Sequence, residues 1–316
     1  FVLVLPAQTT LVDIKGNSVT AGAVLTQTQT SATGMFLAII ATLISVTLLN
    51  KFSKNDKLKI KMHESVPPSI ARSFNVLIPA FLVTTIIGLV EVLVVWLLHT
   101  DIPALIERFF QAPLLASFQS LGGVLIYVFL SNLLWAFGLH GTFILGSIGE
   151  PVMLTAIQQN MDALKKGTEL PNIVTKPFLD CFGWMGGGGM LFCLVIAILI
   201  ASKREDYRSI TKVGLIPSAF NVSEPLMFGL PVVFNPLLAV PLIVVPMITT
   251  TIAYVATSVG LIAKTSALIP WTTPPILSGY LATNGDWKAS VLQVILLALG
   301  VVIYLPFVYL TNREKS

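Results

Sequence analysis

The feature that most constrains this chain is the scarcity of charged side chains over long stretches. Residues 112–149 contain no Asp, Glu, Lys or Arg, and residues 213–263 contain only Glu224. Charged residues make up 11% of the 316 residues and the apolar set AVILMFWYC makes up 55%, whereas an average soluble domain has about 25% charged residues. The composition therefore predicts an integral membrane protein. It excludes a disordered chain, a collagen-like fibre and an ordinary cytosolic enzyme.

Charge-poor stretches long enough to cross a bilayer recur along the chain. A spanning helix needs about 20 mainly apolar residues. We count six or seven crossings, and some apolar sequence is left over that does not divide into spans. We therefore expect an all-α polytopic membrane protein, a multi-span transporter with broken helices and re-entrant hairpins. The stretches are residues 33–50, 74–98, 112–149, 183–202, 213–263 and 289–312.

Basic side chains gather after three of these stretches. By the positive-inside rule such clusters mark cytoplasmic loops, so we expect the three loops and the C-terminus in the cytoplasm. The net charge of +4 is thus interpreted as orientation. Because no basic patch alternates with aromatic residues, nucleic acid is not an expected partner. The clusters are Lys51, Lys54, Lys57, Lys59 and Lys61, then Lys203, Arg204, Arg208 and Lys212, then Arg313 and Lys315.

We expect two parts in the chain. Residues 1–111 would form N-terminal spans and a helix lying in the membrane interface, because residues 101–111 place apolar and charged side chains on opposite helical faces. Residues 112–316 would form a substrate-binding transport domain, with re-entrant segments near residues 138–155 and 217–236. The opening residues 1–6 are typical of the tail of an earlier helix, so we expect an N-terminal portion to be absent.

Glu224 is the first functional candidate, because a carboxylate inside a bilayer costs at least about 2.5 kcal/mol. Six prolines surround it at intervals of five to eight residues, and interior prolines oppose a straight helix. Unwound backbone at membrane depth is tolerated where it lines a polar cavity. We therefore expect four polar side chains to project into a substrate cavity: Asn221, Ser223, Glu224 and Asn235. An aqueous loop that carries Glu224 between two spans stays open as the alternative.

His140 is the second candidate, since Gly138 and Gly141 flank it and let a ligand approach the backbone. The dipeptide Glu150-Pro151 repeats Glu224-Pro225, and paired helix interruptions indicate a transporter binding site. The alternative is a histidine satisfied within the core.

Two tryptophans, Trp135 and Trp271, are candidates for packing against a sugar, whose rings have an apolar face and a rim of hydroxyls. The alternative for both is an anchor at the membrane interface. The chain offers no metal-ligand cluster, since His63 and His99 lie far from other ligand types. We expect no metal and no cofactor. Cys181 and Cys193 are interpreted as small buried apolar residues.

Two motifs resemble a known family: GLHG at residues 138–141 and NVSEPLMFGLPVVFNP at residues 221–236. The second is the more specific, through its N-x-x-E-P core followed by F-G-L-P and N-P. The chain resembles the membrane-embedded IIC subunit of the bacterial phosphoenolpyruvate-dependent sugar phosphotransferase system, in its lactose/cellobiose/diacetylchitobiose branch. Where the family usually has Asn before Glu-Pro, this chain has Ser223.

The resemblance implies a multi-pass homodimer in the bacterial cytoplasmic (inner) membrane, with residues 1–111 as the dimerisation part. It implies that a β-linked disaccharide is carried inward by alternating access and phosphorylated by a cytoplasmic IIB partner. The phosphoryl donor would lie on that phosphorylated IIB, so this chain would be a transport subunit. His140 and Glu224 would act at the phosphorylated hydroxyl and bind the sugar. Asn221, Trp135 and Trp271 would add substrate contacts.

Two other functions compete with this one. A proton-coupled secondary sugar transporter would use Glu224 as its proton carrier and release unmodified sugar. A membrane enzyme acting on lipid-linked sugars would be expected to show an acidic metal-binding pair such as D-x-D, which the sequence lacks.

Overall fold

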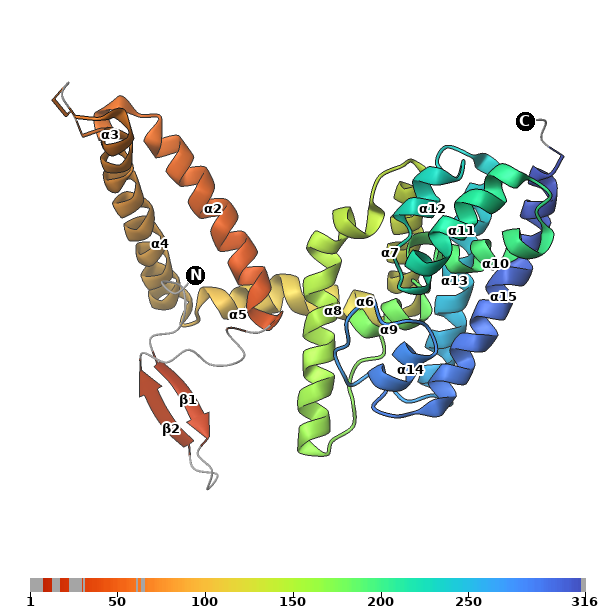
Figure 1. The fold of residues 1–316 in the computed structure, drawn as a ribbon. Coiled ribbons are helices and arrows are strands. Elements are labelled where there is room, and N and C mark those ends of the chain that lie inside the picture. The colour runs from red at the N-terminus through yellow and green to blue at the C-terminus, as the bar shows by residue number, and fades with distance from the viewer. Residues whose placement is uncertain are drawn as a thin grey trace. The chain divides into compact units, whose positions relative to one another are not determined.

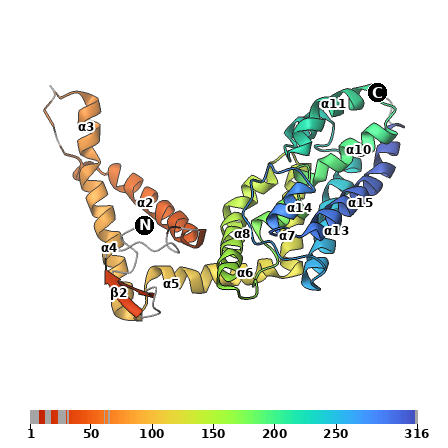
Figure 2. The ribbon, with the colours of Figure 1, turned by 60° about the horizontal axis from the view of Figure 1, so that its bottom comes forward.

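The computed structural model describes residues 8–12, 18–22, 30, 32–60, 62–63 and 66–313. It divides into two compact units, Phe1–Pro113 and Leu114–Ser316, so the boundary lies two residues from the one expected. Residues 1–6, Lys61 and Lys315 lie outside the described residues. Each unit is shown in Figures 1 and 2.

The first unit is built on two apolar helices, α2 (Met35–Ser53) and α4 (Leu77–Leu98), which pack against each other. After α4 the chain turns at His99, whose φ is 52°, and the Asp101 side chain accepts a hydrogen bond from Ala104 N at 2.8 Å. That cap begins a helical run along the segment for which an interfacial helix was predicted. The other elements are β1 (Gln8–Val12), β2 (Ser18–Gly22), η2 (Ala32–Gly34), η3 (Asp56–Leu58), α3 (Pro68–Asn75), α5 (Ile102–Ile106) and the π-helical η4 (Glu107–Gln111). Helix α6 (Ala112–Gln119) contains the boundary, with all but its first two residues in the second unit.

The two strands form an antiparallel hairpin, with Gln8 opposite Gly22 and Val12 opposite Ser18. No strand was expected here from the sequence, although threonine and valine favour strands. The fold is otherwise helical, as the fold-class prediction stated.

The second unit contains the remaining helices. Helix α10 packs against α11 and α15, and α13 packs against α7 and α15 (Figures 1 and 2). The elements are α7 (Leu121–Ala136), α8 (Gly141–Lys166), α9 (Lys176–Phe182), η5 (Gly188–Met190), α10 (Leu191–Ala201), α11 (Glu205–Ala219), α12 (Glu224–Gly229), α13 (Pro236–Ser258), α14 (Leu277–Ala282) and α15 (Trp287–Thr311).

Among the described residues, four helices are long and apolar enough to cross a membrane: Met35–Ser53, Pro68–Leu98, Pro236–Ser258 and Trp287–Thr311. The count becomes five if the bent pair Ile102–Gln119 and Leu121–Ala136 is one span. This is fewer than the six or seven expected. One expected span, residues 183–202, is a glycine-rich turn followed by α10, which has only 11 residues.

The proline-based expectations were partly wrong. Residues 217–236 are interrupted as expected, with the short helix α12 between two turns. However, Pro241 and Pro246 lie inside the 23-residue helix α13, and Pro151 lies inside the 26-residue helix α8. The break near residues 138–155 is therefore confined to the turn before Gly141. Glu150-Pro151 does not mark an interruption like the one at Glu224-Pro225. Neighbouring helices stabilise a proline-containing helix by packing around it.

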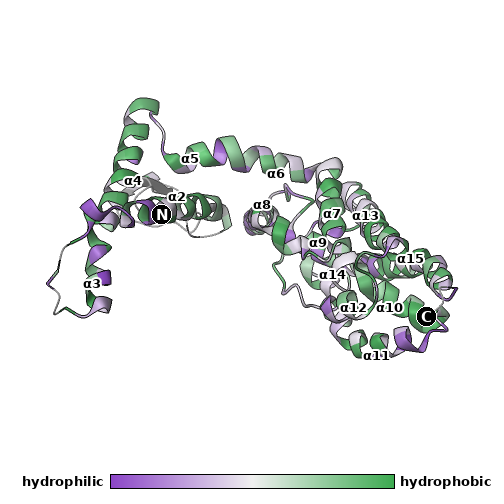
Figure 3. Ribbon diagram, turned by 90° about the horizontal axis from the view of Figure 1, so that it is seen from above, coloured by the Kyte–Doolittle hydropathy of each residue, from purple (hydrophilic) through white to green (hydrophobic). Residues whose placement is uncertain are grey.

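The two units bury their apolar helices to different extents. In α2, 11% of the most apolar stretch is buried inside the protein, against 44% in α13. Figure 3 shows apolar residues along the length of both α2 and α4. Apolar side chains that face outward over whole helices suit a lipid environment rather than water.

Buried amide side chains fix the irregular segments of the second unit. Asn160 on α8 donates to the carbonyls of Asn172 and Thr265, each at 2.8 Å. Gln293 on α15 donates to Cys181 O at 2.7 Å and accepts from Gly279 N at 2.8 Å. These bonds satisfy backbone groups that packing would otherwise leave without partners, and they hold α9 and α14 in place.

Candidate functional site

A partly enclosed cavity of about 200 Å³ lies in the second unit. Its walls come from α7, α8, α9, the glycine-rich turn after α9, the turn before α12, and the loop before α14. All five of the predicted site residues line it: Trp135, His140, Asn221, Glu224 and Trp271. The fold thus brings together side chains that lie up to 136 positions apart in the sequence.

His140 and Glu224 meet across this cavity. His140 Nε2 lies 3.4 Å from Glu224 Oε1. The other ring nitrogen, Nδ1, accepts a hydrogen bond from Phe143 N at 3.3 Å, which caps the start of α8. Because Nδ1 accepts, a neutral His140 carries its proton on Nε2, facing the carboxylate. The pair is partly open to the cavity, with the His140 side chain 28% exposed and the Glu224 side chain 44% exposed.

Two turns place this pair. The turn after α7 and the turn before α13 dock together through a hydrogen bond from Phe234 N to Ala136 O at 2.8 Å. Gly138 has a φ of 75° there, and a Cβ on it would lie 2.9 Å from a methyl group of Val233. Glycine is therefore required at 138 by both conformation and space. This glycine belongs to the GLHG motif, so the motif has a structural purpose beside its histidine.

Aromatic rings surround the histidine. Its ring stacks on Phe143 with centroids 3.8 Å apart and lies 4.2 Å from the Trp135 ring. Trp135 is 1% exposed, and within the described part of the chain its indole Nε1 has no hydrogen-bond partner. A buried indole N–H usually has one. Trp271 is 53% exposed and also lines the cavity.

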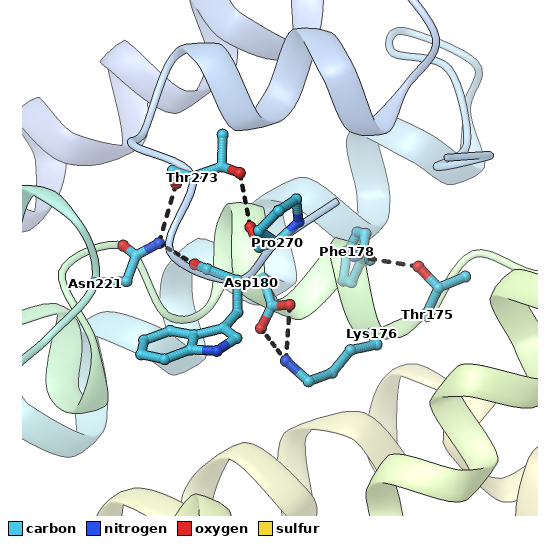
Figure 4. Close-up of polar contacts among 8 residues, drawn as sticks. Thr175, Lys176, Phe178, Asp180, Asn221, Pro270 and Thr273 are labelled. Carbon is cyan, nitrogen blue, oxygen red and sulfur yellow. Dashed lines mark hydrogen bonds and ion pairs between the residues drawn. The ribbon is translucent and has the colours of Figure 1, made fainter. Parts of the chain in front are cut away.

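Asn221 ties three segments together, and Figure 4 shows its bonds to the loop that carries Thr273. Its Nδ2 donates to Trp271 O at 2.6 Å and Thr273 O at 3.2 Å, and its Oδ1 accepts from Gly186 N at 2.8 Å. Its φ is 65°, a left-handed conformation that asparagine tolerates. Both amide hydrogens are thus used within the protein. A direct contact between Asn221 and a substrate stays a prediction.

The expectation for Asn235 was wrong. Its side chain accepts hydrogen bonds from Leu237 N at 2.9 Å and Leu238 N at 3.3 Å, which caps the start of α13. It does not line the cavity. Ser223, by contrast, does.

The cavity wall also holds an ion pair that was not predicted from the sequence. Lys176 Nζ donates to both carboxylate oxygens of Asp180, at 2.6 and 2.7 Å (Figure 4). Asp180 is 8% exposed. A Lys and an Asp four residues apart, directly before an apolar stretch, were the available signal. Glu150 and the backbone of Gly187 and Gly188 also line the cavity.

The described residues contain no group of three or more His, Cys, Asp or Glu side chains placed to hold a metal ion. Cys181 and Cys193 are both buried and free of disulfides. In the cavity Glu224 can accept a hydrogen bond from a ligand and the indole N–H of Trp135 can donate one.

Comparisons with known proteins identify relatives of this chain. The PTS system oligo-beta-mannoside-specific EIIC component of Bacillus subtilis (strain 168) is 39% identical over 278 residues, which covers 87% of this chain and 62% of the relative. The PTS system cellobiose-specific EIIC component of Lactococcus lactis subsp. lactis (strain IL1403) is 35% identical over 302 residues, covering 89% and 61%. The chain thus spans about three fifths of the length of these relatives.

A solved structure is similar over nearly the whole chain. It is the crystal structure of the transporter ChbC, the IIC component from the N,N'-diacetylchitobiose-specific phosphotransferase system, with a TM-score of 0.90 and 35% identity. The match covers 99% of this chain and 73% of that one. A family model described as phosphotransferase system, EIIC, matches residues 1–246. The resemblance inferred from the two motifs is therefore confirmed, and the chain belongs to the phosphotransferase system EIIC family of membrane proteins.

Proposed function

We propose that this chain is the sugar-specific membrane permease (IIC) of a phosphotransferase system. It binds a β-linked disaccharide and carries it across the cytoplasmic membrane of a bacterium by alternating access. The observation that carries the proposal is the His140–Glu224 pair at 3.4 Å in a partly open, aromatic-walled cavity. The names of its relatives, which refer to cellobiose, oligo-β-mannoside and diacetylchitobiose, support the choice of a β-linked sugar.

The cavity matches the two surfaces of a sugar ring. Exposed Trp271 presents a flat apolar face to the C–H side of a ring. The partner-free Nε1 of Trp135 can donate to a hydroxyl or ring oxygen, which would relieve the cost of a buried unpaired donor. Glu224 can accept from one hydroxyl and His140 Nε2 can donate to another.

Phosphorylation of the bound sugar gives the pair its second role. A sugar hydroxyl oxygen attacks the phosphorus of the phosphocysteine on IIB, so that the S–P bond breaks while an O–P bond forms. The hydroxyl proton passes to Glu224, the general base, and His140 orients that carboxylate through Nε2. This chain therefore provides the sugar-binding site and the proton acceptor, and IIB provides the phosphoryl group.

The proposal extends to the assembly. We propose a homodimer formed through residues 1–111, with the C-terminus in the cytoplasm. The basic cluster that follows α10 supports this orientation, since its Lys203 and Lys212 are exposed and basic residues beside spans favour the cytoplasmic side. Phosphorylated IIB would approach from the same side.

The test is binding of radiolabelled cellobiose to the purified wild-type protein and to the variants Glu224→Ala and His140→Ala. We expect each variant to bind at least about tenfold more weakly, because each loses a hydrogen bond to a charged or polarised partner. Unchanged affinity in both variants would discard this site. The matched control is Glu169→Ala, which removes a carboxylate that is 93% exposed and outside the cavity.

Uptake into vesicles separates this function from proton-coupled transport that uses Glu224 as carrier. With phosphorylated IIB present, we expect accumulation of sugar phosphate whether or not a proton gradient is imposed. Accumulation of free sugar that follows a proton gradient without IIB would contradict the phosphotransferase function.

A further inference from the structure

The glycine-rich turn after α9 contributes the Trp184 side chain and the backbone of its glycines to one wall of the cavity. Gly186, Gly187 and Gly189 have φ values of 87°, 84° and 70°, a conformation in which other residues are strained. Gly187 and Gly188 line the cavity. A Cβ on Gly188 would lie 2.6 Å from Nε1 of Trp135. The turn is thus pressed directly against the indole proposed to bind the sugar.

The run of four glycines at residues 186–189 has no side chains with which to hold its own shape, although the flanking Met185 and Met190 are buried. Glycine has more backbone freedom than other residues, and ordering it costs more entropy. We therefore look for side chains of other segments that bond to the backbone of these glycines and keep them in one conformation. Asn221 holds its first glycine, as described above, through Gly186 N.

Two further side chains hold its last glycine from opposite sides. Asn132 Oδ1, on α7, accepts a hydrogen bond from Gly189 N at 2.8 Å. The Tyr304 hydroxyl, on α15, donates to Gly189 O at 2.6 Å. Asn132 and Tyr304 are both 0% exposed. The N–H and the carbonyl oxygen of Gly189 are therefore each hydrogen-bonded to a side chain, and the two side chains come from different helices.

Neither of these side chains lines the cavity. Their bonds to Gly189 give them a route to the ligand through the turn, whose Gly187 and Gly188 line the cavity. Asn132 is also positioned by its own helix, because its Nδ2 donates to Val128 O at 2.8 Å. This bond fixes the orientation of the amide so that its oxygen faces Gly189 N, as in a preorganised anchor.

We propose that Asn132 and Tyr304 are positioning residues for sugar binding. They hold Gly189, and through it the backbone of Gly187 and Gly188 and the indole of Trp135, in the shape that fits the sugar. This inference rests on the proposed function for its ligand. It adds to that function a pair of residues, outside the cavity, on which affinity depends.

We call Asn132 and Tyr304, the two residues that bond to Gly189, the clamp. The test compares two clamp variants, Tyr304→Phe and Asn132→Leu, with a matched control. Tyr254→Phe serves as the control because the Tyr254 hydroxyl also donates to a backbone carbonyl, that of Gln119, at 2.8 Å, and lies outside the cavity. Tyr304→Phe and Tyr254→Phe thus remove the same group and the same kind of bond. Of these two tyrosines, only Tyr304 bonds to the glycine-rich turn.

Two measurements are made on each purified, full-length variant. The first is hydrogen–deuterium exchange of the backbone amides in residues 183–190, which needs no sugar. The second is the dissociation constant for radiolabelled cellobiose. We expect both clamp variants to exchange faster in this segment and to bind cellobiose about fivefold more weakly, as the loss of one buried hydrogen bond predicts. Tyr254→Phe should change neither.

The outcomes separate the two proposals. Exchange in residues 183–190 that stays at the wild-type rate in both clamp variants overturns the inference. Faster exchange with unchanged affinity overturns it as well, because the turn would then be held without consequence for the sugar. Equal loss of affinity in Tyr254→Phe would make the effect one of general stability and would also overturn it. If the wild type binds no β-linked disaccharide, the proposed function fails, and the exchange comparison alone decides whether the clamp exists.

Discussion

Two carboxylates line the same cavity and are held in opposite ways. Asp180 is 8% exposed and both of its oxygens accept from Lys176, at 2.6 and 2.7 Å. Glu224 is 44% exposed in its side chain and its nearest basic group, His140 Nε2, is 3.4 Å away. One carboxylate is saturated by its partner, and the other is not.

This difference indicates that Asp180 has a structural role in the site and that Glu224 has a chemical one. A buried carboxylate with short bonds to an ammonium group has little capacity left for a ligand, and removing its partner leaves a buried charge. A carboxylate that is loosely paired and open to the cavity can accept a hydroxyl proton and can change partners during a reaction. We therefore expect substitution of Glu224 to affect phosphorylation and substitution of Asp180 to affect folding.

The largest expected effect is that of Glu224→Gln on phosphorylation. Glutamine keeps the size of the side chain and can still accept a hydrogen bond, but it cannot take a proton. Sugar phosphorylation by phosphorylated IIB should fall by about 100-fold or more, while cellobiose affinity falls only about threefold. The measurements are single-turnover formation of sugar phosphate and equilibrium binding, each on the same preparation.

Glu169→Gln is the control for this change, because Glu169 lies outside the cavity and its side chain is 93% exposed. It should leave both quantities at the wild-type level. Equal losses of binding and phosphorylation in Glu224→Gln would remove the distinction drawn above and make Glu224 a plain binding residue.

Asp180→Leu should have the next largest effect, on stability. The change leaves the Lys176 ammonium, whose side chain is 20% exposed, without its partner. We expect the free energy of unfolding to fall by about 3 kcal/mol, the usual cost of breaking a buried pair from one side. Thermal unfolding of the detergent-solubilised protein measures this.

The double variant Lys176→Met with Asp180→Leu is compared with Asp180→Leu in the same unfolding measurement. Replacing both charges by apolar side chains should recover most of the lost stability. A double variant as unstable as Asp180→Leu alone would mean that the aspartate supports the fold by some other contact.

The sequence predicted the class of fold and both residues of the His140–Glu224 pair because charge in an apolar stretch is costly and therefore conspicuous. It could not place the helix breaks. A proline removes one hydrogen bond, and whether the helix ends there depends on what packs around it. Pro241 and Pro246 are accommodated inside α13, which packs on α7 and α15.

Three other features of the site also depend on tertiary structure. The glycine-rich turn shortened an expected span, because Gly186, Gly187 and Gly189 adopt positive φ values that no hydropathy pattern reports. Asn221 lines the cavity, and the sequence could not show that its amide hydrogens also bond to the loop that carries Trp271. Lys176 and Asp180 were missed since opposite charges four residues apart usually indicate an exposed helix surface. Their position in a cavity wall follows from how α9 packs.

The smallest expected effect belongs to a third pair, Arg204 and Asp206. This pair is short but exposed, so it tests whether distance or burial makes Asp180 behave differently from Glu224. Arg204 Nη2 donates to Asp206 Oδ2 at 2.7 Å, as short as the Lys176–Asp180 bonds, yet the Asp206 side chain is 54% exposed. The hydrogen bond from Arg204 lowers the pKa of the Asp206 carboxyl below its usual value of 3.8. Because the folded pKa is the lower one, the pair stabilises the protein above the usual value, and this stabilisation is lost as pH falls through the folded pKa.

Asp206→Asn should therefore lower the free energy of unfolding by less than about 1 kcal/mol near neutral pH, and by less again in high salt, because water and ions screen an exposed pair. Thermal unfolding of both proteins at neutral and acidic pH, at low and high salt, checks this, and the two proteins should converge in acid. A loss as large as that of Asp180→Leu would mean that short distance alone decides the strength of these pairs. A small loss leaves burial as the property that makes Asp180 a structural residue and leaves the exposed Glu224 free to react.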